Sequence, residues 1–315
     1  MGKGSGWQMI DGIARRLGPA LHNRVARAIL AAPPIAPVED GSLIFSMIGT
    51  RVLLPYLVAV KSLHARLGRG RVAILDDGTL TAADRRVLAD HCGDPEIRSI
   101  RDVDTGPCPR GGCWERLLTL LDLTERDYVI QLDSDTVTLG AIPEVAEAIA
   151  ANRAFTLLGG EDAEARGLLS LPAFMAACHP EGPVDPAGPV HVQLAIEGNW
   201  RRYPDAARHR YVRGCAGFAG FPRGGPGRAA AEAFSRNAEA IVGREVWRRW
   251  GSEQVASNFL VSNSPDPLLL PYDRYANYWN EAPGADMRFL HFVGTHRYAK
   301  GEYRRRTRQA IAALG

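Results

Sequence analysis

The sequence predicts an α/β fold in which a mostly parallel, Rossmann-like sheet has helices on both faces. Short apolar strands alternate with helical stretches from residue 42 onwards, which is the order of elements that produces such a sheet. The chain has 315 residues, long enough to bury one large core. Its 46% apolar and 23% charged residues exclude a collagen-like, disordered or coiled-coil protein. We therefore expect a single large domain of two abutting halves.

The alternation is clearest in the first half of the chain. Pro55 falls within the first turn of its expected helix, and Thr81 is a suitable N-cap for the next one. Beyond Gly140 the strands are scattered among long polar insertions, and the 21 prolines of the chain favour irregular connections there. The expected strands are 43–48, 71–75, 97–103 and 128–132, and the expected helices are 51–67, the segment capped by Thr81, and 114–123.

Both ends of the chain are basic. The first 35 residues carry a net charge of +4 and the last 20 carry +5, whereas the whole chain carries only +3, so the body between them is acidic. Residues 8–32 have apolar side chains at helical spacing, which predicts a basic amphipathic helix that either packs on the body or lies on a membrane interface. A nucleic-acid partner is not expected. A protein that binds nucleic acid usually carries a stripe of basic residues across its folded body, whereas the basic residues here gather at the two ends of the chain.

The cysteines favour a reduced compartment. There are five, an odd number, with no C-x-x-C pair, so free thiols are expected and a Cys108–Cys113 disulfide is the alternative. The chain has no run of about 18 apolar residues, so no membrane-spanning helix is expected. The apolar stretch 28–32 is too short to be the apolar core of a secretory signal peptide. These observations predict a cytoplasmic protein, with peripheral contact at the inner face of the membrane through the basic ends as a further hypothesis.

Two carboxylates follow the expected strand 128–132. Asp133 and Asp135 are spaced so that they can share a hard divalent cation and leave its other positions to phosphate oxygens. Ligands gather at the carboxyl ends of parallel strands. A D-x-D pattern also arises by chance, and the second one, Asp102 to Asp104, follows no long apolar strand, so we assign it to a solvated loop.

A second motif begins at His291, after the strand-like segment 287–290. A lone histidine in this position is more often structural. Here Gly294 permits close approach of the backbone, and Arg297 provides a cation that can meet a phosphate. The three residues together describe a diphosphate pocket.

Two further segments are candidates for chemistry. Glu253 and Gln254 open the apolar stretch 255–260, although Glu253 alone would be an ordinary acid in the first turn of a helix. The small-residue strand 213–220 contains several glycines, which either let a ligand ring lie against the backbone or mark a bulge.

The linear order of these motifs resembles the family 8 glycosyltransferases, which include glycogenin and the bacterial lipopolysaccharide galactosyltransferases. The resemblance covers roughly residues 43–300. It implies a GT-A fold, a nucleotide-sugar donor, Mn²⁺ (or Mg²⁺) as cofactor, and transfer with retention of anomeric configuration. It also implies metal ligation by Asp133, Asp135 and His291.

The resemblance assigns donor-binding and catalytic roles as well. Gly294 and Arg297 fall on the family's H-x-x-G-x-x-K, with arginine replacing the lysine that holds the diphosphate. Arg116 matches the arginine that reaches the donor sugar. Glu253 and Gln254 look like the Asp-Gln pair lining the reaction centre, where Glu253 either stabilises an oxocarbenium-like centre or acts as a nucleophile.

The remaining donor positions depart from the family pattern. Cys215, Ala216 and Gly217 stand where the family usually has Asn-x-Gly, so Cys215 replaces an asparagine whose amide binds sugar. Gly49 and Thr50 end the first strand without the acidic and aromatic residues that often grip uridine, so UDP is expected on the resemblance alone. Ser134, between the two aspartates, completes the expected donor set.

The expected function is therefore a metal-dependent glycosyltransferase that moves a sugar from a nucleotide sugar to a glycan, lipid-linked or other acceptor, such as a growing bacterial surface polysaccharide. The alternative is a non-catalytic or membrane-docked sugar-nucleotide-binding protein of the same fold. A nucleotidyltransferase ranks last, because residues 49–51 are a poor phosphate loop. The expected organisation is a basic arm and Pro-rich linker (1–41), a nucleotide-sugar-binding half (42–140), an acceptor and catalytic half (141–300) whose residues 161–210 shape the acceptor site, and a basic tail (301–315).

Overall fold

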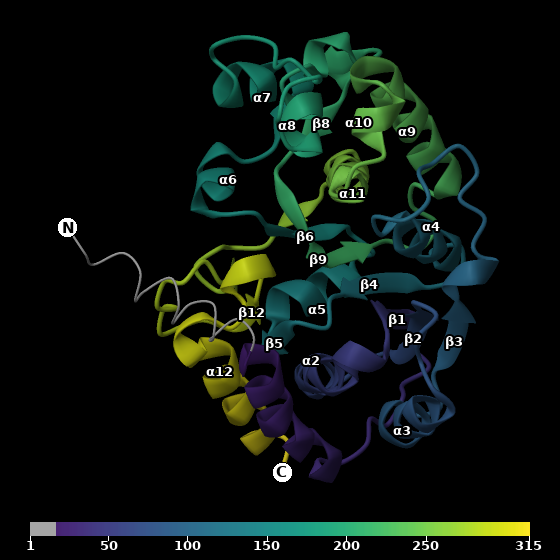
Figure 1. Ribbon diagram of the computed structural model, residues 1–315, viewed down its shortest axis with the longest axis vertical. Coiled ribbons are helices and arrows are strands. Elements are labelled where there is room, and N and C mark those ends of the chain that lie inside the picture. Colours follow the sequence, from purple (N-terminus) through teal and green to yellow (C-terminus); the bar gives the residue numbers. More distant parts are fainter. Residues whose placement is uncertain (1–16) are drawn as a thin grey trace.

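A seven-stranded sheet runs through the middle of the molecule in the computed structural model, which describes residues 17–315 (Figure 1). All neighbouring strands are parallel except for one, which is antiparallel to both of its neighbours. The α/β class predicted from the sequence is confirmed. In spatial order the strands are β10 (Leu268–Leu269), β6 (Phe155–Leu158), the antiparallel β9 (Gly214–Phe221), β4 (Tyr128–Leu132), β1 (Ser42–Ile48), β2 (Arg71–Asp76) and β3 (Glu96–Ser99).

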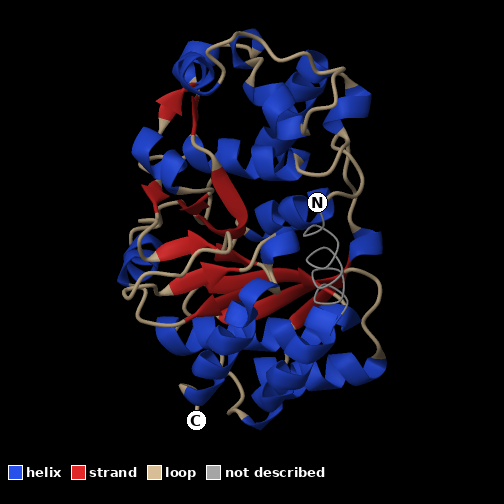
Figure 2. Ribbon diagram, turned by 60° about the vertical axis from the view of Figure 1, so that its left-hand side comes forward, coloured by secondary structure: helices blue, strands red, loops and turns tan. Residues whose placement is uncertain are grey.

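Helices cover both faces of this sheet, as Figure 2 shows. Along β1, Leu43 and Phe45 point into one apolar layer whereas Ile44 and Ile48 point into the other, so each face is buried. The first layer contains α4 (Trp114–Leu123), α7 (Leu171–Cys178), α8 (Val192–Glu197), α9 (Arg228–Val242), α10 (Arg244–Trp247) and α11 (Ser252–Ser262). The second contains α2 (Leu53–Leu67), α3 (Ala82–Cys92), α5 (Pro143–Ala150), α6 (Glu161–Arg166) and α12 (Glu302–Ala312).

Two small sheets complete the fold. The strand β12 (Phe289–His291) lies between β11 (Tyr275–Asn277) and the antiparallel β5 (Thr136–Thr138), which directly follows the D-x-D turn after β4. This pairing places two segments of the site side by side although they are far apart in sequence. The second small sheet pairs β7 (Leu169–Ser170) with β8 (Arg210–Tyr211).

Short 3₁₀ segments connect several of these elements. They are η1 (Arg27–Ala31), η2 (Thr50–Val52), η3 (Ile100–Asp102), η4 (Trp200–Arg202), η5 (Ala206–Arg208), η6 (Gly294–His296) and η7 (Ala299–Gly301). The predicted helix 51–67 is therefore a 3₁₀ turn followed by α2. No helix in residues 17–315 is long and apolar enough to cross a bilayer.

The described part of the predicted N-terminal helix packs on α12. Residues 17–26 are helical, and the ring of His22 stacks on Tyr303 with centroids 3.7 Å apart. His22 Nε2 is 3.0 Å from Thr307 Oγ1. Packing on the body is thus what these residues do, whereas positions 8–16 of the prediction lie outside the described residues.

The segment predicted as a Pro-rich linker, 33–37, is anchored to the body. Ile35 is buried and its N–H donates to the carbonyl of His91 at 3.0 Å. The prediction that a helix starts after Thr81 is confirmed, since Thr81 Oγ1 accepts from the N–H of Asp84 and the Asp84 carboxylate accepts from the N–H of Thr81.

Two strand predictions need correction. The predicted strand 97–103 is wrong in its second half: β3 ends at Ser99, whose hydroxyl accepts from the N–H of Arg101 at 3.2 Å and starts η3. Because β3 is an edge strand paired only with β2, no neighbour holds the later residues extended. The strand predicted at 287–290 begins two residues later, at Phe289, and includes His291.

Candidate active site

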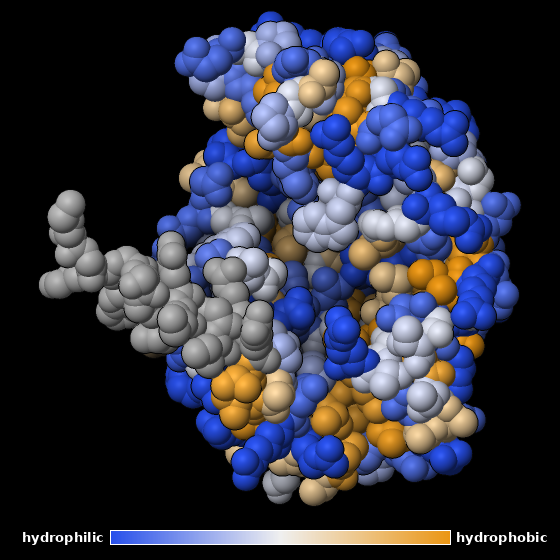
Figure 3. All heavy atoms as spheres, in the orientation of Figure 1, coloured by the Kyte–Doolittle hydropathy of each residue, from blue (hydrophilic) through white to orange (hydrophobic). Residues whose placement is uncertain are grey.

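A cleft of about 1040 Å³ opens at the end of the main sheet, where the carboxyl ends of β4 and β6 meet the amino end of β9. Its walls come from segments that are far apart in sequence, including the start of α4, the turn before α6, the start of α8 and the loops around α11 and β12. Figure 3 shows a hollow at mid-height on this face of the molecule, with hydrophilic residues at its edges. Its volume suits a ligand of the size of a cofactor or a nucleotide sugar.

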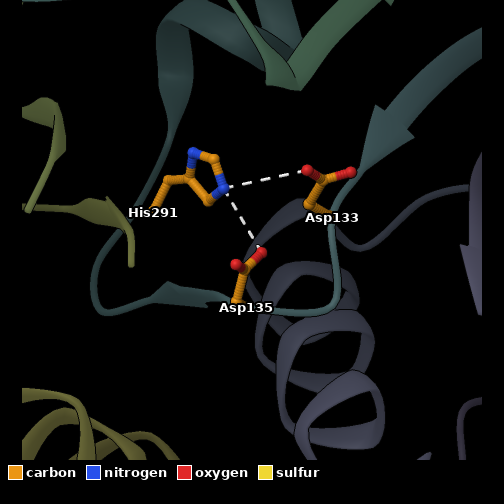
Figure 4. A group of neighbouring side chains, drawn as sticks. All are labelled: Asp133, Asp135 and His291. Atoms are coloured by element: carbon orange, nitrogen blue, oxygen red, sulfur yellow. Dashed lines mark ion pairs between the residues drawn. The ribbon is translucent and has the colours of Figure 1, made fainter. Parts of the chain in front are cut away.

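Asp133, Asp135 and His291 converge in this cleft (Figure 4). The antiparallel register of β5 and β12 sets His291 opposite Thr136, the residue after Asp135. His291 Nε2 lies 3.2 Å from Asp135 Oδ1 and 3.8 Å from Asp133 Oδ2. One ligand atom from each residue lies within 4.8 Å of the others, so the three can share one cation.

The histidine ring is held in the orientation that a metal ligand needs. Its Nδ1 lies 2.9 Å from Asn277 Oδ1, and the Asn277 amide donates in turn to the carbonyl of Leu158 at 2.9 Å. This fixes the amide oxygen toward the ring, so Nδ1–H is the donor and Nε2 faces the two carboxylates. The residues present therefore fit a hard divalent cation such as Mn²⁺ or Mg²⁺.

Gly217 makes room for the same ring. A Cβ at this position would lie 2.4 Å from His291 Cε1. The carbonyl of Gly217 also accepts from the N–H of Asp133 at 2.9 Å, so β9 fixes both the aspartate turn and the histidine. Any larger residue at this position must displace the imidazole.

Each carboxylate of the site is paired with an arginine. Arg297 forms an ion pair with Asp135, and its Nε donates to the carbonyl of Phe292 at 3.1 Å. Arg116 pairs with Asp133, and its Nη2 lies 3.2 and 3.3 Å from the two carboxylate oxygens of Glu253. The two arginines thus offset most of the negative charge of the three acids at this centre, which are buried or half-buried.

Burial and neighbouring charge shift the acid–base properties of this centre. Burial raises the pKa of Glu253 to about 7, although the adjacent Arg116 opposes that rise. For Asp135, burial would raise the pKa, but His291 and Arg297 hold it below its usual range. Burial alone would lower the pKa of His291, but Cys215 and Asp135 raise it by more than burial lowers it. The net shift of this pKa is therefore upward. A cation bound at Nε2 would therefore replace a proton.

The loop before α4 delivers Arg116 to the cleft. Gly111, Gly112 and Cys113 all have positive φ, at 85°, 58° and 73°, so the chain turns tightly into the helix. The indole Nε1 of Trp114 donates to Ser252 Oγ at 2.8 Å, which joins the first residues of α4 and α11. This contact sets Arg116 opposite the acid at the start of α11.

The structure brings most of the predicted donor residues to the cleft and leaves others outside it. Cys215 Sγ lies 3.3 Å from His291 Nδ1. Ser134 does not line the cleft, and its carbonyl accepts from the hydroxyl of Tyr303 at 3.4 Å. The predicted residues that line the cleft besides the three candidate metal ligands are Arg116, Cys215, Ala216, Glu253, Gln254, Gly294 and Arg297.

Gly49 and Thr50 also lie outside the residues that line the cleft. Gly49 has no room for a side chain because a Cβ there would lie 2.2 Å from Asp77 Oδ1. The hydroxyl of Thr50 donates to Asp84 Oδ2 at 2.6 Å. Their assignment to donor binding stays a prediction.

Other contacts in the site have no local sequence motif. Arg213 lines the cleft, and its Nε lies 3.2 Å from the fully buried carboxylate of Glu197. The amide of Gln193 donates to Glu197 Oε1 at 2.9 Å and accepts from Gln254 Nε2 at 3.4 Å. No local motif marked Gln193, Glu197 or Asn277, and Arg213 stood out only as the first residue of the small-residue strand 213–220. Of the positions that fix His291, only Gly217 had a signal, as part of the same strand.

The other sequence candidates are placed as expected. Asp102 and Asp104 are exposed, in agreement with a solvated loop. All five cysteines are free, so Cys108 and Cys113 form no disulfide.

No protein-family profile matches this sequence, and no curated protein sequence is similar to it at a significant level. Three glycosyltransferases are among the solved structures that match. The bifunctional glycosyltransferase WbbM, without ligand, matches 83% of this chain at 12% identity with a TM-score of 0.47, and this chain spans 47% of its length. The galactosyltransferase LgtC in complex with donor and acceptor sugar analogues matches 86% of this chain and 95% of its own at 13% identity, with a TM-score of 0.49. Mouse xyloside xylosyltransferase 1, without ligand, matches 80% and 96% at 9% identity, with a TM-score of 0.44.

Proposed function

We propose that this chain is a metal-dependent glycosyltransferase of the GT-A type, similar to family 8, that transfers a sugar from a UDP-sugar to a glycan or lipid-linked acceptor with retention of configuration. The observation that supports it most is the convergence of Asp133, Asp135 and His291 at the carboxyl end of a parallel sheet, in a cleft large enough for a nucleotide sugar. Two carboxylates and one oriented imidazole form the donor set of a cation that in turn binds phosphate oxygens.

Asp133, Asp135 and His291 would hold the Mn²⁺ or Mg²⁺, and the bound cation would neutralise the diphosphate as it leaves. Arg297 lies beside Asp135 and adds a fixed positive charge in the same place. Its planar fork can bind two phosphate oxygens in a fixed bidentate geometry, whereas the lysine of the family pattern acts as a point charge. Gly294 leaves space beside this charge for the close approach of a ligand.

Arg116, Glu253 and Gln254 are proposed to surround the donor sugar. Arg116 bridges Asp133 and Glu253, so it links the candidate metal site to the reaction centre. Both oxygens of Glu253 face Arg116, and this favours stabilisation of an oxocarbenium-like centre over nucleophilic attack. A trapped glycosyl-enzyme adduct on Glu253 would reverse that preference.

The acceptor would enter from the second half of the chain. Residues between 161 and 210 contribute five positions to the cleft wall, at the turn into α6 and at the start of α8. We propose residues 42–140 as the donor half and residues 141–300 as the acceptor and catalytic half. The basic ends would hold the protein at the cytoplasmic face of a membrane, near a lipid-linked acceptor.

The test is a thermal-shift panel of UDP-, GDP-, CMP- and dTDP-sugars, each with and without Mn²⁺. A ligand that binds only the folded state raises the melting temperature, so a shift that requires both Mn²⁺ and one nucleotide sugar is expected, with UDP-sugars giving the largest. An unchanged melting temperature with every pair would contradict the proposal.

The same samples separate catalysis from binding alone. Release of the free nucleotide over time, dependent on Mn²⁺, is expected of a transferase, because water replaces a missing acceptor slowly. Donor binding without any release of nucleotide, in the presence of acceptor extracts, would favour the non-catalytic sugar-nucleotide-binding protein, for which the missing amide at Cys215 is the motivation.

A further inference from the structure

Two tryptophans line the cleft and remain exposed to solvent. Trp250 is 73% exposed and Trp279 is 47% exposed, whereas Trp114, Trp200 and Trp247 are fully buried. An exposed indole that lines a cleft offers a large, flat apolar face that a ligand can cover. Neither residue belongs to the metal site or to the predicted donor set.

Trp279 is fixed in place rather than free to swing. Its Nε1 donates to the carbonyl of Gly159 at 3.3 Å, and its ring meets His296 edge-on with centroids 5.7 Å apart. Gly159 is two residues before the exposed Glu161, so the indole and this carboxylate belong to the same wall of the cleft. We call the residues Gly159, Glu161, Trp279 and Glu281 the acidic lip.

Trp250 lies on a second wall, which we call the amide lip: His191, Gln193, Trp250 and Gln254. The indole meets the ring of His191 edge-on with centroids 5.8 Å apart. His191 is anchored, because its Nδ1 accepts from the N–H of Gln193 at 3.2 Å and its ring packs against Gly251.

Both lips are connected directly to the centre of the site. Trp279 follows two residues after Asn277, which bonds to His291, and Trp250 precedes Glu253 by three residues. Gln254 donates to Gln193 across the amide lip. Both indoles therefore line the same cleft as the groups proposed to carry out transfer.

The charges of the cleft select among ligands. Every arginine that lines it is paired with a carboxylate: Arg116 with Asp133, Arg213 with Glu197 and Arg297 with Asp135. On the acidic lip, Glu161 and Glu281 are exposed and form no ion pair with any other residue in 17–315. Free carboxylates accept hydrogen bonds from hydroxyl groups and repel anions.

We propose that Trp250 and Trp279 are stacking platforms for the acceptor, and that the acceptor presents uncharged sugar rings at this cleft rather than a phosphate or a sugar acid. This rests on the proposed function and narrows its substrate class. An indole covers the apolar C–H face of a pyranose, while Glu161 and Glu281 accept from its hydroxyl groups. The acceptor end of the cleft is therefore built for neutral saccharides.

The experiment is saturation-transfer NMR with the full chain in the presence of UDP and Mg²⁺, which is diamagnetic and, unlike Mn²⁺, does not broaden the signals of bound ligands. The probes are the methyl glycosides of glucose, galactose, mannose and N-acetylglucosamine at millimolar concentration, together with the anionic methyl glucuronide and galacturonide. At least one neutral glycoside should receive saturation from the protein, and its anionic counterpart should receive much less. Trp250→Ala and Trp279→Ala should each weaken binding of the neutral probe by roughly tenfold, the effect of losing one aromatic contact.

Matched variants separate stacking from folding. Trp279→Phe and Trp250→Phe keep a ring and should retain most of the binding, whereas Leu30→Ala removes an exposed apolar side chain (37% exposed) elsewhere and should change nothing. No transfer to any neutral glycoside, equal transfer to the anionic ones, or full binding in both alanine variants would overturn the proposal. The signals of UDP in the same samples report the donor site, so a lost UDP signal with an intact sugar signal would count against the proposed donor and not against the platforms.

Discussion

The chain contains the same D-x-D pattern twice, and the two copies have opposite surroundings. Asp102 and Asp104 are exposed near the edge strand β3, and neither carboxylate forms an ion pair within residues 17–315. Asp104 instead accepts from the N–H of Gly106 at 2.9 Å, which is an ordinary turn contact. Asp133 and Asp135 follow the central strand β4 and meet two arginines and a histidine.

The difference shows that the position of a strand in the sheet, and not the motif, decides what the carboxylates can do. The end of a central strand is covered by neighbouring elements, so Asp135 is only 5% exposed. A buried carboxylate is stable only when hydrogen-bonding or oppositely charged partners replace its water. An edge strand ends in water, where a carboxylate is solvated and needs none. The comparison can be tested by changing each copy, its supporting residues and its charges.

The largest effect is expected from removing the carboxylates themselves. Asp135→Ala should abolish Mn²⁺-dependent transfer, a loss of about a thousandfold or more, because a cation ligand and the partner of Arg297 both disappear. Asp102→Ala should leave activity unchanged and alter the free energy of unfolding by less than about 0.5 kcal/mol. Initial rates of nucleotide release with and without Mn²⁺ measure the first, and urea unfolding measures the second.

An equal loss of activity in the two variants would break the comparison. Asp135→Ala with full Mn²⁺-dependent activity would remove the metal assignment altogether. Since a buried ion pair is broken in this variant, its melting temperature should be recorded at the same time, and Asp135→Asn serves as the nearly isosteric second variant.

A smaller effect is expected at Gly217, which supports the buried copy. Gly217→Ala places a Cβ 2.4 Å from the ring of His291 and should displace it, weakening Mn²⁺ binding by about 10- to 100-fold as the loss of a supporting contact does. Titration of Mn²⁺ by calorimetry measures this. Gly284→Ala is the matched control, because no atom lies within 4 Å of a Cβ there. Unchanged Mn²⁺ affinity in Gly217→Ala would show that His291 does not need its present position.

The smallest effect is expected in the pH dependence of stability. The pKa of Glu253 is raised by burial from 4.5 to about 7, so the folded state favours its protonated form. Its stabilising contribution is present in full below pH 4.5 and is lost as the pH rises through about 7. Glu253→Gln has no carboxyl group to ionise, so its stability does not fall in this way as the pH rises. Between pH 4.5 and about 7, the melting temperature of the variant should therefore rise by about 2–5 °C relative to that of the wild type.

Thermal unfolding of both proteins over this pH range provides the measurement. Asp122→Asn is the control, since Asp122 also pairs with an arginine, Arg228, but at the surface, where such a pair contributes little. Parallel curves for wild type and Glu253→Gln would mean that Glu253 is not a buried acid of raised pKa.

The first half of the fold could be predicted from the sequence because its signals are local, whereas most elements after Gly140 were not predicted. Strands β1, β2 and β4 and helix α4 lie within a residue of their predicted bounds, since apolar runs and helical spacing depend on neighbours along the chain. The failure at residues 100–103 has the same origin: an apolar run cannot report that β3 lies at an edge of the sheet.

The candidate site could be predicted only in part. Asp133 and His291 could be predicted from their positions at or just after the ends of strands, but the residues that orient them could not. Asn277 reaches His291 because β11 and β12 pair in register, and this pairing leaves no mark in the local sequence. The contact of Arg116 with Glu253 spans 137 positions and depends on the packing of α4 on α11.

The sequence by itself determined the α/β class, the order of the first strands and helices, the Thr81 cap, and the polar residues that follow each strand. Tertiary structure alone decided which D-x-D is buried, that Arg297 pairs with Asp135, and that Trp250 and Trp279 line one cleft. The physical reason is the range of the forces involved. Backbone conformation and apolar periodicity are set by residues a few positions apart, whereas burial, ion pairing and pKa depend on which distant elements the folded sheet brings together.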